Sequence, residues 1–408
     1  MSHLKFIHAA DVHLDSPFIG LSQLPEDIFQ QVKESTFRAF EKMIDLAINE
    51  KVDFIVISGD VYDGEERSLR AQLFFQKQME RLQKNGINAY VIYGNHDHTS
   101  GDSLQIDLPE NVFTFSDQEV ECVNVKRHGK VIASIYGFSY PERSVFENMS
   151  KKYERKTNAP YHIGLLHGSL AGERDHEPYC PFKLSDLLEK NFDYWALGHI
   201  HKRQVLHEES PTILYPGNLQ GRHMKETGEK GVYLVEFHEK NVSYEFYPLS
   251  NIIFQEQLID LTNIHSISQL LSTVQEKKEE LRMKYEGTFC KLTLTGRSSL
   301  FRKLHQDGVI EEIKEHLNDI EHKNKFVWIL SINNETIPNK EDFIEESSLF
   351  TQDFEAVLDQ YEIDEALKPL YKNTSFRRFI APFTKEEKEE IIREAKEFIF
   401  YEWLKNRN

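Results

Sequence analysis

The sequence predicts an α/β protein with a second, smaller α+β domain and a helical C-terminal region. Up to about residue 250, short apolar runs alternate with helix-like stretches, which is the pattern of strands connected by helices. Between residues 251 and 340, three strand-like segments enclose two helical stretches. From residue 341, an acidic stretch leads to segments with helical periodicity. We therefore expect three parts, 1–250, 251–340 and 341–408.

The first part consists of predicted strands, several of which end in polar residues. LKFIHAADVH (4–13) is the first of these, and residues 26–49 place apolar side chains at helical spacing. VDFIVISGD (52–60) is a buried strand with a turn, and a polar helix is expected near 68–84 before AYVIYGNHD (89–97). Later strand candidates are VIASIYGFSY, HIGLLHG, DYWALGH, TILYPGN, GVYLVEF and VSYEFYPL. This order predicts largely parallel pairing at first and antiparallel strands later.

The second and third parts differ in their pattern. Strands are expected at FQEQLIDL, CKLTLTG and KFVWILSI, with helices near 266–284 and 299–320. The last helix begins after Thr384, which is a candidate N-cap followed by glutamates. Its apolar residues fall on one face: Ile391, Ile392, Ala395, Phe398, Ile399 and Trp403. That face either packs in a core or docks a partner.

Composition limits the classes of protein to which the chain can belong. The 408 residues carry a net charge of −18, which argues against a strongly basic surface for nucleic acid. No apolar run reaches the roughly 18 residues of a membrane span, and no signal-peptide pattern is present. The thiols of Cys122, Cys180 and Cys290 lack metal-binding spacing. We therefore expect a cytoplasmic protein without membrane association, with its thiols packed as small hydrophobes.

Polar side chains follow five of the apolar strands, at the point where each strand ends. They are Asp11-Val12-His13, Gly59-Asp60, Gly94-Asn95-His96-Asp97, His167-Gly168 and Gly198-His199-Ile200-His201. Because ligands gather at the carboxyl ends of strands in open α/β sheets, we expect these loops to converge. Aspartate, histidine and asparagine suit Mn²⁺ or Fe²⁺ better than thiolate-binding metals. This number of ligands exceeds the need of one ion and indicates two sites that share a carboxylate.

This ordered set resembles the calcineurin-like metallophosphoesterases. The motifs DVHLDSP, GDVYD, GNHD, the single His167 and GHIH resemble the SbcD-like DNA-repair exonuclease branch, and the layout is closest to its YhaO type. The likeness runs from residue 6 to residue 221 and includes the turn Tyr215-Pro216-Gly217-Asn218. It implies a four-layer sandwich of two mixed sheets flanked by helices, followed by a small α+β capping domain and a helical tail.

The resemblance also implies roles for individual residues. One metal would be held by Asp11, His13, Asp60 and His201, and the other by Asp60, Asn95, His167 and His199, with Asp60 bridging. His96 would stand outside the metals as the general acid for the leaving oxygen, and Asp63 is the candidate that orients it. Asp97 is expected to fix its turn through local hydrogen bonds.

Other polar residues carry weaker signals. His98, His176 and His223 are candidates for contacts with substrate or for solvated loops, whereas His3 and His8 are expected to be structural. The segment KKYERK (151–156) contains basic residues around one aromatic residue. It is either a contact for phosphates or a solvated surface.

Three functions remain open. The first is an Mn²⁺-dependent DNA phosphodiesterase, a repair exonuclease or endonuclease in which a metal-bridging hydroxide attacks in line. Residues 251–340 would then position DNA. Residues 341–408 would dock an SMC-like ATPase of the SbcC type, because the chain has no phosphate-binding loop of its own. The second is a small-molecule phosphoesterase for nucleotides or cyclic nucleotides, and the third is a non-enzymatic scaffold. A homodimer is left open in each case.

Overall fold

The computed structural model divides into two compact units. It describes residues 3–21, 23–64, 67–100, 106–172, 178–239, 241–319, 321, 325–339, 356–357, 361–372 and 383–405. The first unit comprises Met1–Gln255, Lys284–Phe289 and His322–Val327, and the second comprises Glu256–Met283, Cys290–Glu321 and Trp328–Asn408. The predicted domain boundaries near residues 250 and 340 stay predictions.

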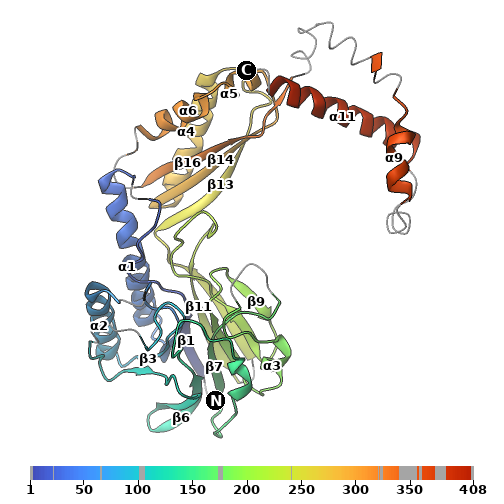
Figure 1. Ribbon diagram of the computed structural model, residues 1–408. Coiled ribbons are helices and arrows are strands. Elements are labelled where there is room, and N and C mark those ends of the chain that lie inside the picture. The colour runs from blue at the N-terminus through green and yellow to red at the C-terminus, as the bar shows by residue number, and fades with distance from the viewer. Residues whose placement is uncertain are drawn as a thin grey trace. The chain divides into compact units, whose positions relative to one another are not determined.

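The first unit contains two six-stranded mixed sheets (Figure 1). In the first sheet, the strand order is β12-β11-β1-β2-β3-β4. Its strands are β1 (His3–Ala9), β2 (Phe54–Ser58), β3 (Asn88–Ile92), β4 (Val112–Thr114), β11 (Gly231–His238) and β12 (Asn241–Pro248). β1 to β4 run parallel, whereas β11 is antiparallel to both β1 and β12. The predicted change from parallel to antiparallel pairing is confirmed within this sheet.

The second sheet has the order β5-β6-β7-β8-β10-β9. Its strands are β5 (Glu121–Arg127), β6 (Lys130–Gly137), β7 (His162–His167), β8 (Tyr194–Gly198), β9 (Gln204–His207) and β10 (Thr212–Tyr215). The four central strands are parallel, and the two edge strands, β5 and β9, are antiparallel to their neighbours.

The buried side chains form three hydrophobic clusters on the faces of the two sheets. Successive residues of a strand point to opposite faces, so one strand contributes to two clusters. Ile55 and Ile57 of β2 pack in a cluster with the helices α1 (Glu26–Asn49) and α2 (Leu69–Lys84). The intervening Phe54 and Val56 face the second sheet. In that sheet, Trp195 packs outward in a third cluster, which includes Leu187 of α3 (Leu184–Leu188) and Met149 of the 3₁₀ helix η1 (Met149–Lys152). The layers are therefore helix, sheet, sheet, helix, and the predicted sandwich is confirmed.

The two helices predicted in the first part are confirmed. α1 buries one face, which includes Val32, Phe40 and Ile44. α2 begins after Ser68, whose side chain accepts a hydrogen bond from the backbone N of Ala71 and so caps the helix. Cys180 and Cys290 are buried and Cys122 is partly buried, as expected for thiols that pack as small hydrophobes.

The segment from residue 252 to residue 339 contains a three-stranded sheet of order β13-β14-β16. Its elements are β13 (Ile252–Asp260), α4 (Ile267–Lys284), β14 (Gly287–Thr295), β15 (Arg297–Ser298), α5 (Phe301–Leu304), α6 (Val309–Asp319), β16 (Phe326–Asn334) and β17 (Ile337–Pro338). The helix predicted over 299–320 is wrong in one respect, because it is divided into α5 and α6. Gly308 between them has a φ of 83°, a left-handed conformation that cannot continue a right-handed helix.

Two helices are described in the C-terminal region, α9 (Ile363–Lys372) and α11 (Lys385–Lys405). The predicted N-cap is confirmed, because Thr384 Oγ1 accepts from Glu387 N at 3.2 Å and Glu387 Oε2 accepts from Thr384 N at 2.7 Å. Phe398 is 64% exposed and Ile399 is 41% exposed, so this part of the apolar face is not packed in a core. The Trp403 side chain and the acidic stretch at 341–350 lie outside the described residues.

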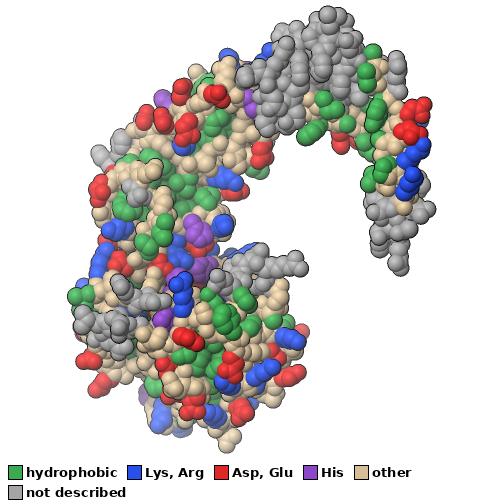
Figure 2. Space-filling view, in the orientation of Figure 1, with side chains coloured by type: hydrophobic (Ala, Val, Ile, Leu, Met, Phe, Trp, Pro, Cys, Tyr) green, Lys and Arg blue, Asp and Glu red, His purple; other side chains and the backbone are tan. Residues whose placement is uncertain are grey.

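Charge is mixed on the molecular surface. On the face shown in Figure 2, acidic and basic side chains are interspersed rather than segregated. None of the helices described here is both long enough and apolar enough to cross a lipid bilayer.

Candidate metal centre

The polar loops that follow strands of both sheets meet at one edge of the sandwich. β1, β2 and β3 of the first sheet lead into the loops with Asp11 and His13, with Asp60, and with Asn95. In the second sheet, β7 ends at His167, and β8 leads into His199 and His201. The structure thus brings the whole predicted ligand set together: Asp11, His13, Asp60, Asn95, His167, His199 and His201. Their role as metal ligands stays a prediction.

Four of these residues form a first group. The Nε2 atoms of His13 and His201 lie 3.1 Å apart. His201 Nε2 is also 3.9 Å from Asp11 Oδ1, and His13 Nε2 is 3.7 Å from Asp60 Oδ2. Asp11, His13 and Asp60 are almost completely buried, so water does not compete freely for these atoms.

The second group shares Asp60 with the first. Asn95 Oδ1 lies 3.0 Å from His167 Nε2 and 3.2 Å from His199 Nδ1. His167 Nε2 is 3.6 Å from Asp60 Oδ2, the oxygen that also faces His13. Asp60 Oδ2 therefore faces both groups, as the predicted bridging ligand would. The other oxygen, Oδ1, accepts a hydrogen bond from His96 N at 3.0 Å.

Acceptor oxygens face the Nδ1 atoms of three of the four histidines. His167 Nδ1 is 2.9 Å from the Ser58 carbonyl oxygen, His13 Nδ1 is 2.9 Å from Asp63 Oδ1, and His201 Nδ1 is 2.6 Å from Glu226 Oε1. Carbonyl and carboxylate oxygens only accept, so the Nδ1 atoms of His167 and His201 carry the proton and their Nε2 atoms present a lone pair. The contact of His13 Nδ1 with Asp63 lacks hydrogen-bond geometry, but the nearby carboxylate favours the same tautomer by charge.

The opposed lone pairs of His13 and His201 test whether the site fits a metal. Two nitrogen lone pairs that meet at 3.1 Å repel each other unless a cation lies between them. Donors that each bond one ion at about 2.1 Å are spaced by about 3 Å when they are adjacent in its coordination shell. The observed spacing therefore fits a small divalent ion held by nitrogen and oxygen.

The electrostatics of the buried groups also favour cations. Burial raises the pKa of Asp11, and the nearby charge of Asp60 raises it further. Burial likewise raises the pKa of Asp60. Burial lowers the pKa of His13 and His201, and it lowers the pKa of His167 to about 3, so the imidazoles are neutral. Neutral imidazoles cannot balance the negative charge of the crowded carboxylates, whereas bound divalent ions would balance it.

The backbone at the site is strained. Asp11, His13, Asp60 and His199 have φ values of 49°, 48°, 52° and 94°, in a region that residues other than glycine rarely adopt. Glycine is required at Gly198, where a Cβ atom would lie 1.8 Å from the Ser58 carbonyl oxygen. This close approach allows the end of β8 to meet the end of β2.

Asp63 divides its contacts between several partners. His96 Nδ1 lies 3.4 Å from Asp63 Oδ1, but His13 Nδ1 is closer at 2.9 Å, and Arg222 Nη1 donates to the same oxygen at 2.6 Å. Ser16 Oγ donates to Oδ2 at 2.6 Å. Although burial opposes ionisation, the contact with His13 and the charge of Arg222 hold the pKa of Asp63 well below its usual range. Asp63 is predicted to orient His96, but its contact with His96 is longer than its contact with His13.

Asp97 fixes its own turn and also ties two loops together. Its Oδ1 accepts from Gly94 N at 2.8 Å, as predicted. Its Oδ2 accepts from Val61 N at 2.7 Å and from Tyr62 N at 3.2 Å, in the loop that follows β2. Burial and the charge of Asp60 raise the pKa of Asp97 to about 6.

The two groups do not include the described histidines His3, His8, His98 and His223. His8 is buried, with Nδ1 2.9 Å from the Tyr194 hydroxyl and Nε2 3.1 Å from the Leu197 carbonyl oxygen, so its predicted structural role is confirmed. His98 Nδ1 is 2.9 Å from Ser100 Oγ. His3 lies near Glu236 and His238 on the neighbouring strand, and the exposed His223 lies 3.4 Å from Glu226 Oε1. His176 is outside the described residues.

The aromatic residue of the basic segment 151–156 is part of the core. Tyr153 is fully buried, and its hydroxyl donates to the Leu165 carbonyl oxygen at 2.5 Å. It is therefore not available to stack on a nucleic-acid base, which favours the interpretation of this segment as a solvated surface.

Two residues at the centre, Arg222 and Glu226, were not predicted from the sequence. Glu226 contacts His201, and Arg222 contacts Asp63, across 25 and 159 residues of chain. No strand end or motif marks either residue, so the sequence pattern offers no local signal for them.

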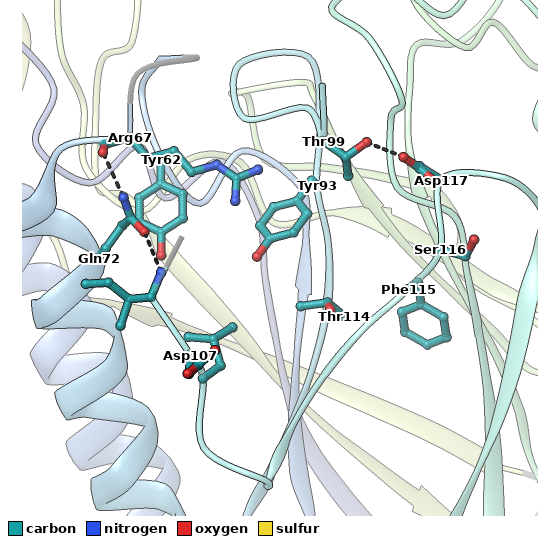
Figure 3. A pocket seen from close by; sticks show the side chains of 12 residues that line it. Tyr62, Arg67, Gln72, Tyr93, Thr99, Asp107, Thr114, Phe115, Ser116 and Asp117 are labelled. Atoms are coloured by element: carbon teal, nitrogen blue, oxygen red, sulfur yellow. Dashed lines mark hydrogen bonds between the residues drawn. The ribbon is translucent and has the colours of Figure 1, made fainter. Parts of the chain in front are cut away.

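A cavity of about 450 Å³ adjoins the loops of the centre (Figure 3). Tyr62, Arg67, Tyr93, Asp107 and Asp117 are among the residues that line it. The Arg67 guanidinium lies over the Tyr93 ring at 4.2 Å and donates to the His98 carbonyl oxygen at 3.2 Å. None of the predicted ligands lines this cavity.

Comparisons with known proteins agree with this fold. The family model of the calcineurin-like phosphoesterases matches residues 4–203, and that of the middle domain of the metallophosphoesterase YhaO matches residues 254–337. The chain is 44% identical, over 97% of each chain, to the uncharacterized metallophosphoesterase YhaO of Bacillus subtilis. It is 26% identical to the DNA double-strand break repair protein Mre11 of Sulfurisphaera tokodaii, over 68% of this chain and 70% of the relative. The predicted family is thereby confirmed, and the chain belongs to the calcineurin-like metallophosphoesterases, a family of metal-dependent hydrolases.

Proposed function

We propose that the protein is a DNA phosphodiesterase of the nuclease type, which uses two divalent ions, most simply Mn²⁺, with Fe²⁺ as the other suitable ion. The observation that carries this proposal is the position of Asp60 Oδ2, at 3.7 Å from His13 Nε2 and 3.6 Å from His167 Nε2. One carboxylate oxygen can thereby serve two adjacent ions. Such a pair suits the displacement of an oxygen at phosphorus, where charge develops on two oxygens.

The side chains of this centre have separate tasks. The bound ions would supply an activated water and charge stabilisation for the phosphate, and they would be held by Asp11, His13, Asp60, Asn95, His167, His199 and His201. His96 is 37% exposed and donates its backbone N to Asp60. Its imidazole packs against the ring of His13, with 4.8 Å between the ring centroids, and a ring nitrogen lies within 4.8 Å of ligand atoms of His13 and Asp60. It would give a proton to the leaving oxygen, with Asp63 at 3.4 Å as its anionic neighbour.

Three observations support DNA as the substrate. Relatives of this chain at 26% and 25% identity are described as DNA double-strand break repair proteins. The segment 252–339 adds a separate sheet and helices that hydrolysis of a small ester does not require. Helix α11 exposes Phe398 and Ile399, which suits a role as the docking segment for an SbcC-type ATPase.

A small-molecule phosphoesterase is the second candidate, and the cavity beside the centre favours it. Its volume of about 450 Å³ falls within the range of pockets that bind small ligands, about 300–1,000 Å³. The cavity lies next to the loops that carry Asp63 and Asn95.

Parallel assays on linear DNA and on bis(p-nitrophenyl) phosphate would separate the two candidates. The metal-free protein is supplied with Mn²⁺, with Fe²⁺ under anaerobic conditions, or with a chelator as control. We expect Mn²⁺-dependent cleavage of DNA. Hydrolysis of the small ester with no cleavage of DNA, with or without the partner ATPase, would reject the nuclease proposal and favour the second candidate.

A further inference from the structure

We infer that Asp63 and Glu226, joined by Arg222, act as positioning residues that make the group of Asp11, His13 and His201 the tighter of the two metal positions. The inference rests on the two-metal centre proposed above, and it concerns how strongly each ion is held rather than which substrate is cut.

Glu226 is held in one place behind His201. It is only 6% exposed, and its Oε1 lies 2.6 Å from His201 Nδ1. Its Oε2 accepts from Asn218 Nδ2 at 2.9 Å and from the backbone N of Arg222 at 2.7 Å. A carboxylate behind a ligating histidine fixes the orientation of the ring and makes the opposite nitrogen more basic.

Arg222 connects this carboxylate with the one behind His13. Its Nη1 donates to Asp63 Oδ1 at 2.6 Å, and its Nη2 lies 3.9 Å from Glu226 Oε1. Two negative groups thus stand behind the first metal position with one positive group between them. Lys230 is a second positive group here, because its Nζ donates to the His201 carbonyl oxygen at 3.0 Å. The two carboxylates are thereby balanced, so they act by orienting and polarising the two imidazoles, and the negative charge that belongs to the first position is the carboxylate of Asp11.

At the second metal position, the group that orients the ligating histidine His167 is uncharged. His167 Nδ1 faces the carbonyl oxygen of Ser58 at 2.9 Å, which carries no formal charge. The neutral amide of Asn95 stands where the first group has the carboxylate of Asp11. In the ligand set that the family resemblance implies, Asp60 is the one carboxylate of this group, and it is shared. Asp11 lies at the border of the two positions, because a ligand oxygen of Asp11 is also within 4.8 Å of the ligand atoms of Asp60 and His167. Because electrostatic attraction dominates the binding of a hard divalent ion, the first position should fill before the second.

A titration of the metal-free protein with Mn²⁺ tests the inference without measuring hydrolysis. Electron paramagnetic resonance of free Mn²⁺ together with calorimetry would give the stoichiometry and both dissociation constants. We expect two distinct steps. Glu226→Gln should weaken the tighter step by about 10–100-fold and leave the weaker step unchanged. Asn95→Ala should do the reverse and weaken only the second step.

Two further variants secure the interpretation. Glu229→Gln makes the same change of charge at an exposed position three residues away, and it should leave both steps unchanged. Asn218→Ala keeps the Glu226 charge but removes one of its hydrogen bonds, so a smaller weakening of the tighter step is expected, even if Glu226→Gln fails to fold.

Several results would overturn the inference. These are two equal sites, a Glu226→Gln effect on the weaker step, or an effect no larger than that of Glu229→Gln. Stepwise binding without DNA cleavage would reject the proposed substrate and leave the inference standing. Binding of fewer than two ions by the unaltered protein would reject both.

Discussion

The two sheets contribute different chemistry to the metal centre. The loops of the first sheet supply every carboxylate and amide of the ligand set, Asp11, Asp60 and Asn95, together with His13. The ends of β7 and β8 in the second sheet supply imidazoles alone, at His167, His199 and His201. Neither sheet presents a complete ligand group for either ion. The centre therefore depends on how firmly the two sheets are joined. Substitutions at five positions test the centre and the contacts between the sheets: Asp60, His199, His96, Gly198 and His8.

The largest effect is expected where one side chain serves both ions. Asp60→Ala should abolish both steps of Mn²⁺ binding and lower turnover by at least about 10⁴-fold, because each ion supplies several kcal/mol of charge stabilisation. His199→Ala, from the second sheet, should remove one ion and leave the other. Metal content per chain, measured beside hydrolysis, checks both variants. An Asp60→Ala protein that kept two ions would show that Asp60 is not the bridge.

The next prediction concerns His96, which follows a strand of the first sheet but belongs to neither predicted ligand group. His96→Asn should keep both ions and lower turnover on DNA by about 10³-fold, the usual scale of a general acid. The loss should be much smaller on bis(p-nitrophenyl) phosphate, because its acidic leaving group needs little protonation. An equal loss on both substrates would contradict a role in protonating the leaving oxygen, and loss of metal would assign His96 to the ligands.

A substitution at Gly198 tests the close approach of β8 to β2, where the two sheets meet. A Cβ atom there would meet the Ser58 carbonyl oxygen at 1.8 Å, so Gly198→Ala must push β8 and β2 apart. We expect the metal-free protein to lose about 1–3 kcal/mol of unfolding free energy, which urea denaturation measures. Gly64→Ala is the matched control, since no atom lies within 4 Å of the new Cβ, and it should change the free energy by less than about 0.5 kcal/mol. Equal losses would show that the close approach is not a constraint.

The last prediction concerns the pH dependence of stability at His8, which lies in the buried contact between β1 and β8. Burial lowers the pKa of His8 from 6.5 to about 3. Between these values the unfolded chain binds a proton that the folded protein does not, so stability decreases as the pH falls from 6.5 towards 3. His8→Gln removes this proton and should flatten the pH dependence by up to about 1.4 kcal/mol per pH unit between pH 4 and 6. Urea denaturation across that range checks it, and an unchanged slope would contradict the buried neutral imidazole.

Much of the fold follows from local patterns in the sequence. The helix at 26–49 was predicted from its apolar spacing, which is a local signal, and a polar helix was predicted near 68–84. The strand ends that carry the site were also visible, because each buried strand stops abruptly at a polar residue. Edge strands such as β4 and β5 were missed because they are partly exposed and lack a continuous apolar run. The break between α5 and α6 was missed because apolar spacing does not report the left-handed conformation of Gly308.

At the centre, the sequence predicted only those residues that belong to recognisable motifs. The ligand set occurs in recognisable motifs, and the structure brings its members together. Arg222 and Glu226 belong to a long-range network that depends on how the loop after β10 folds back over the site. The preference of Asp63 for His13 over His96 has the same origin, because it depends on distances of a few tenths of an ångström. Spacing along the chain carries no information of this kind.

The support of His167 by a main-chain oxygen has an evolutionary consequence. Every amino acid carries a carbonyl group, so no replacement of Ser58 by itself deletes the acceptor that orients this ring. The ring of His201 depends instead on a glutamate side chain, which a single nucleotide change can alter. Natural variation can therefore alter the support of His201 through a single mutation, whereas the support of His167 is not open to replacement in this way.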